Sequence, residues 1–84
     1  MFHYLDVISL NEFEQILLLY DIILDRRETL KLLLFLRHNM IAIYRLDLAR
    51  QLSDSMVHLT DGHMTCNQAL DVIIYFYATG QKKT

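Results

Sequence analysis

Apolar side chains recur every three or four residues along most of this chain, which is the spacing of one face of an α-helix. The resulting stripes predict four helices, over residues 10–24, 26–38, 40–58 and 66–78. Polar residues cover the other side of the third helix, whereas the first, second and fourth carry apolar residues on more than one face. The pattern therefore predicts an all-α fold, a small bundle of four helices in a single domain over residues 1–84.

Cap residues support these helix starts. Three positions have the spacing of a capping box, in which the first side chain accepts from a backbone N–H three residues on and the second side chain reaches back. The pairs are Ser9 with Glu12, Asp25 with Glu28, and Thr65 with Gln68. Asn39 and Gly80 are placed to end helices, because both residue types tolerate the left-handed conformation of a C-cap. We expect residues 1–8 and 80–84 to form short frayed ends.

Two points stay open in this assignment. The break at Asn39 is one, because the second and third helices could instead join through a bend. The segment 72–77 is the other, because its β-branched and aromatic residues also suit a strand. The capping box before it and Gly80 after it favour a helix.

The bulk of the apolar residues raises the question of what covers them. Hydrophobic residues make up 54% of only 84 residues, and a chain of this size hides only about 60% of the surface that its unfolded form exposes. We therefore expect dimerisation to complete the bundle; a compact monomer and an obligate different partner are the alternatives. The apolar residues that we expect at such an interface are Leu18, Leu19, Ile22, Leu32, Phe35, Leu36, Tyr75 and Phe76.

Charge is segregated along the chain although the net charge is only −2. Residues 1–25 hold five acids and no Lys or Arg, whereas residues 26–50 hold six bases and two acids. We expect Arg26, Arg27, Lys31 and Arg37 to form a charged rim that orients a protein partner. The alternative is a small dimeric transcriptional regulator that contacts DNA through the basic 26–50 segment, although the overall acidity argues against nucleic acid as a general ligand.

One segment of the chain is similar to part of a helix-turn-helix, a motif that binds DNA. Residues 47–55 resemble the first helix and turn of that motif, in which an alanine packs against the second helix. Asp54 falls where an apolar residue packs, and Gly62 interrupts the segment that would have to be the recognition helix. The match therefore ends at the turn.

The remaining residues offer little catalytic or metal chemistry. His58, Asp61, His63 and Cys66 have side chains that zinc accepts, but their spacing matches no common zinc pattern. The two glycines stand apart and form no phosphate loop. We expect no enzyme activity, no cofactor and no metal.

The cysteine count and the longest uncharged run bear on where the protein is located and whether it spans a membrane. One cysteine excludes an internal disulfide framework and favours the reducing cytoplasm. The longest uncharged run, residues 72–81, is too short to span a bilayer. The sequence thus predicts a cytoplasmic helical protein–protein interaction module that acts as a regulatory, adaptor or chaperone-like protein.

Overall fold

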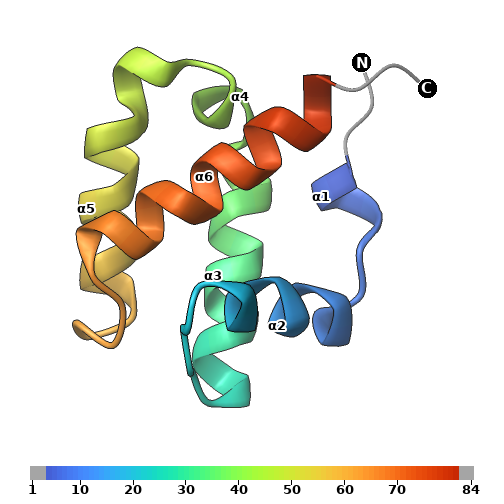
Figure 1. Ribbon diagram of the computed structural model, residues 1–84, viewed down its shortest axis with the longest axis vertical. Coiled ribbons are helices and arrows are strands. Elements are labelled where there is room, and N and C mark those ends of the chain that lie inside the picture. The colour runs from blue at the N-terminus through green and yellow to red at the C-terminus, as the bar shows by residue number, and fades with distance from the viewer. Residues whose placement is uncertain (1–3, 82–84) are drawn as a thin grey trace.

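The computed structural model describes residues 4–81, and its regular elements are all helical (Figure 1). They are α1 (Tyr4–Val7), α2 (Leu10–Leu19), α3 (Arg26–His38), α4 (Met40–Ile43), the 3₁₀ turn η1 (Leu46–Leu48), α5 (Ala49–Leu59) and α6 (Cys66–Gln81). The long helix α6 crosses the molecule diagonally and packs mainly against α5, whereas α2 packs against α3. The all-α prediction is confirmed, and the segment 72–77 is helical.

The three predicted capping boxes are formed. In the first, the Ser9 hydroxyl accepts from the amide of Glu12 at 3.1 Å, and the Glu12 carboxylate accepts from the amide of Ser9 at 2.8 Å. The box before α3 has the same two bonds, and Thr65 and Gln68 form the third at the start of α6. The predicted start of the second helix at residue 26 and that of the fourth at residue 66 are therefore confirmed.

The predicted helix over 10–24 is five residues too long, because α2 ends at Leu19. Asp21 adopts a left-handed conformation with φ 59°, its amide donates to the carbonyl of Leu18, and the next amide donates to that of Leu17. This is a Schellman motif, which satisfies the last carbonyls of the helix and turns the chain away. Asp61, with φ 53°, ends α5 in the same way.

Replacing Asp21 or Asp61 with glycine should raise the free energy of unfolding by up to about 1 kcal/mol each. An L-residue in the left-handed region costs about 1–2 kcal/mol that glycine avoids, and an acid at a helix C-terminus opposes the helix dipole. The measurement is urea unfolding followed by circular dichroism. The matched alanine variants should be less stable than the parent, and equal stability of the glycine and alanine variants at one position would contradict this explanation.

The predicted helix over 40–58 is interrupted, and this is the largest departure from the sequence prediction. After the short helix α4, Arg45 is extended with φ −120° and ψ 90°, and a 3₁₀ turn leads into α5. The break redirects the chain so that α5 lies against both α3 and α6. It leaves Ile41 81% and Leu46 52% exposed, so these two apolar residues are not part of a continuous buried stripe.

The core lies where α2, α3, α5 and α6 meet. Phe13 and Phe76 stack with ring centroids 6.0 Å apart, and Phe76 also contacts Tyr4 and Tyr75. Each helix contributes its stripe to this core; the residues exposed by less than 2% include Phe13, Leu17, Ile22, Leu32, Leu33, Leu36, Ile43, Met56, Met64, Val72 and Ile73. A single chain therefore encloses a continuous apolar core.

The N-terminal segment is held in place where fraying was expected. Leu5 and Ile8 are buried, and Arg37 of α3 donates hydrogen bonds of 2.9 Å and 2.8 Å to their two carbonyl oxygens. A cation thereby satisfies carbonyls at the end of α1, where helical carbonyls have no partner of their own. Residues 1–3 of the predicted frayed end lie outside the described residues.

Gly80 does not cap α6, which continues through it to Gln81. Gly80 is instead buried against Tyr44, and a Cβ at this position would overlap the phenol ring. Glycine is therefore explained by the close approach of the two elements rather than by a helix end. The predicted frayed end 80–84 begins inside the helix, and residues 82–84 lie outside the described residues.

Candidate protein-binding surfaces

A groove between α3 and α5 is hollowed into the described surface. It consists of two adjoining hollows of about 280 and 410 Å³, which share Phe35 and Ser55. Together they are lined by Phe35, Asn39, Ala42, Leu48, Gln51, Leu52, Asp54, Ser55, His58 and Leu59. The apolar members form a floor and the polar members a rim, which is the usual composition of a protein-binding groove. We call this hollow the α3–α5 groove.

The predicted interface residues divide between the groove, the surface and the core. Phe35 lies in the α3–α5 groove, Leu18 and Leu19 are 46% and 67% exposed, and Tyr75 is half-buried. Ile22, Leu32, Leu36 and Phe76, by contrast, are buried in the core of the single chain. We expected these four residues to contact a second chain, and the structure corrects this. The packing of six helices buries more apolar surface within one chain than the four predicted helices would bury.

Several exposed apolar residues were not among those predicted at an interface. Leu30 and Leu34, one helical turn apart on α3, are 44% and 43% exposed, and Ile74 on α6 is 53% exposed. Leu48 and Leu59, which line the α3–α5 groove, were not predicted at a surface either. Their spacing fits a core and a groove equally well, so only the packing of α5 against α3 separates the two.

The predicted charged rim is also divided. Arg37 is half-buried and bonded to the carbonyls of α1, so it is corrected from a rim residue to an internal clamp. Arg26 is exposed and donates to Asn11 at 3.3 Å. Arg27 and Lys31 are exposed and form no hydrogen bond or ion pair within residues 4–81. These two cations flank Leu30 and Leu34 on the outer side of α3.

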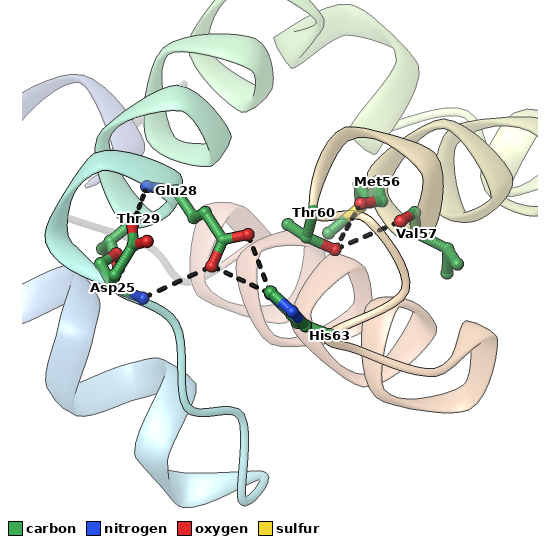
Figure 2. Close-up of polar contacts among 7 residues, drawn as sticks. All are labelled: Asp25, Glu28, Thr29, Met56, Val57, Thr60 and His63. Atoms are coloured by element: carbon green, nitrogen blue, oxygen red, sulfur yellow. Dashed lines mark hydrogen bonds and ion pairs between the residues drawn. The ribbon is translucent and has the colours of Figure 1, made fainter.

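A carboxylate and a histidine connect two distant parts of the chain (Figure 2). Glu28 is only 9% exposed. Its Oε2 lies 2.8 Å from Nδ1 of His63, and its Oε1 accepts a hydrogen bond from the amide of Asp25. The contact joins the first turn of α3 to the loop between α5 and α6, and Thr60 in that loop is buried with its hydroxyl bonded to the carbonyl of Met56. The polar groups of this region are thus used to fix the loop.

The residues considered for zinc do not form a metal site. His63 contacts Glu28, whereas Cys66 Sγ lies 3.2 Å from Ser53 Oγ and 3.8 Å from Asp54 Oδ1. His58 lies apart, on the rim of the α3–α5 groove. Among residues 4–81 no group of three His, Cys, Asp or Glu side chains is placed to hold a metal ion.

Side-chain contacts connect the residue that ends α2 to α6. Tyr20 and Tyr75 meet edge to face with centroids 6.5 Å apart, and Gln68 Nε2 donates to the carbonyl of Tyr20 at 3.0 Å. Burial raises the pKa of Tyr20, and the nearby carboxylate of Asp71 raises it further. The pKa of Tyr4 is raised mainly by burial and to a smaller extent by Tyr75 and Glu12. Asp71 therefore acts on Tyr20, whereas Glu12 acts on Tyr4.

Comparison with known proteins yields no relative: no family model, no curated protein and no solved structure matches the chain. Within the described part of the chain, none of the helices has the length and apolar character needed to cross a bilayer.

Proposed function

We propose that this chain is a non-enzymatic interaction module that takes a short amphipathic helix of a partner protein into the α3–α5 groove. The observation that carries the proposal is the pair of hollows that meet at Phe35. A side chain that is half-buried at the centre of such a groove is the typical anchor of a protein interface, because the surrounding contacts exclude water from it.

The dimensions of the groove support a helical ligand. The lining residues run from Leu48 to Leu59, which is about 16 Å of helix length at a rise of about 1.5 Å per residue. This corresponds to about three turns of a bound helix, so apolar side chains three, four or seven residues apart could fill both hollows. Asn39, Gln51 and Asp54 supply polar groups for the flanks of that helix.

The alternative, contact with DNA through the basic 26–50 segment, has less support. Of the six bases in this segment, Arg37 is bonded to backbone carbonyls and Arg45 lies 3.0 Å from Asp47. The hydrogen bond between Arg45 and Asp47 lowers the pKa of the Asp47 carboxyl, which keeps this acid charged beside the base. The remaining bases lie on two different helices, α3 and α5, rather than along one recognition helix.

The proposal is tested with a displayed library of amphipathic helical peptides selected for binding to the intact chain. Replacing Phe35 with alanine should weaken binding of the selected peptides by tenfold or more, as is usual for a central anchor. Gln15, which is exposed on α2 and remote from the groove, provides the matched alanine control and should leave binding unchanged. Equal binding to the Phe35→Ala variant and the parent would contradict the proposed site.

A further inference from the structure

The exposed side of α3 is a short ridge that is both basic and apolar. Arg27, Leu30, Lys31, Leu34 and His38 are all exposed, and no acid lies among them. The buried residues of α3, Leu32, Leu33 and Leu36, lie on the opposite side of the helix. We call the exposed residues the basic ridge.

A second exposed surface has the opposite charge. It consists of Glu12, Leu19 and Tyr20 on and after α2, together with Asp71, Ile74 and Tyr75 on α6, and we call it the acidic face. Leu19 is 67% and Ile74 53% exposed, so apolar surface lies between the carboxylates here too. Residues 1–25 and 66–81, which supply this face, contain six acids and no Lys or Arg.

The basic ridge and the acidic face lie on opposite sides of the molecule. α2 packs against α3, its buried residues Phe13, Ile16 and Leu17 lie in the core, and its exposed side points away from that core. The basic ridge is the side of α3 turned away from the same core, and α6 lies with α2 in front of α3 in Figure 1. One partner copy therefore cannot cover both surfaces at once.

We propose that the basic ridge of one copy docks on the acidic face of a second copy, so that the chain associates head to tail. Opposite charges orient the two surfaces, and the exposed leucines and isoleucine supply the apolar contact. A docked pair still presents one free ridge on one copy and one free acidic face on the other. Such a heterologous contact does not stop at two chains unless the copies close into a ring.

This association differs from the closed homodimer that the sequence suggested, and it uses surfaces other than the α3–α5 groove. A closed dimer needs a self-complementary patch, which two like-charged ridges or two like-charged faces do not provide. A failure of head-to-tail association would leave the groove and its helical ligand unaffected, and the reverse also holds.

The test is sedimentation equilibrium of the parent chain and of two variants with reversed surfaces. The ridge variant carries Lys31→Glu and Leu34→Glu, and the face variant carries Leu19→Lys and Asp71→Lys. The parent should show an average mass that rises with concentration beyond twice the 10.0 kDa monomer. That mass should fall as salt rises from about 0.01 to about 1 M, because screening shortens from about 30 to about 3 Å.

Each variant alone should remain at the monomer mass, because its reversed surface has the same sign of charge as the unaltered surface on which it would have to dock. An equimolar mixture should again associate, because the unaltered face of one variant meets the unaltered ridge of the other. Arg50→Glu, a change of exposed charge on α5 outside both surfaces and outside the α3–α5 groove, is the matched control and should associate like the parent. Unchanged circular dichroism of all variants verifies the fold.

Three results would overturn the proposal. The first is a parent chain that stays at the monomer mass at low salt and millimolar concentration. The second is a parent that stops at two chains, since this indicates a closed dimer. The third is a ridge variant or a face variant that is folded and associates as strongly as the parent.

Discussion

Replacing Phe76 with alanine is expected to lower the free energy of unfolding by about 3–5 kcal/mol. The side chain is 2% exposed, and its ring lies 6.0 Å from that of Phe13 and 6.3 Å from that of Tyr4. Truncation removes these contacts and leaves a cavity that helices α1, α2 and α6 cannot fill without moving. Because small domains are stable by only about 5–15 kcal/mol, this one change removes much of the margin.

Leu19→Ala is the matched control for this prediction. Leu19 is 67% exposed, so its truncation should change stability by no more than about 0.5 kcal/mol. Both variants are compared with the parent by urea unfolding at several protein concentrations. A Phe76→Ala variant that unfolds like the Leu19→Ala variant would show that Phe76 is not part of the core of the isolated chain.

Replacing Arg37 with leucine is expected to lower the free energy of unfolding by about 2 kcal/mol and to release α1. The guanidinium donates charge-assisted hydrogen bonds to the carbonyls of Leu5 and Ile8, and bonds to a charged group contribute about 1.5–3 kcal/mol each. The loss stays below their sum, because a detached α1 can bond its carbonyls to water. Leucine keeps much of the apolar stem, so the effect reports mainly the lost donors.

Amide hydrogen exchange locates the change. The amide of Ile8, bonded to the carbonyl of Tyr4 at 3.1 Å, should lose most of its protection in the Arg37→Leu variant. Protection in α5 should fall only by the amount that the global stability falls. Lys31→Leu, which alters an exposed base on the same helix, should leave the protection of Ile8 as in the parent.

The sequence predicted best those features that depend on residues close together. The capping boxes at Ser9 and Asp25 consist of side chains three residues apart, so the starts of α2 and α3 follow from local chemistry alone. The end of α2 does not follow from local chemistry, because Asp21 is an uncommon residue in the left-handed position and the apolar stripe continues beyond it to Leu24. Periodicity reports which residues are buried, not whether the backbone between them stays helical.

The candidate surfaces depend on contacts between distant segments, and there the sequence predicted less. Phe35 was expected at an interface and lies in a groove, but the opposite wall, with Ser55 and Leu59, is supplied by a helix some twenty residues later. Gly80 was read as a helix end because nothing in the sequence indicates that Tyr44 approaches it. The segregation of charge was visible from the start, whereas its division into two opposite surfaces required the packing of α2 on α3.

The contact between α1 and α6 has a consequence for the order in which the molecule can be completed. Tyr4 packs on Phe76, so the packing of the first described helix is completed by the last one. During synthesis Tyr4 therefore has no aromatic partner from α6 until the chain has been made as far as Phe76. We expect this domain to complete its core in one cooperative step only after α6 has been made, and nascent chains that stop before α6 to be the species most exposed to aggregation and proteolysis.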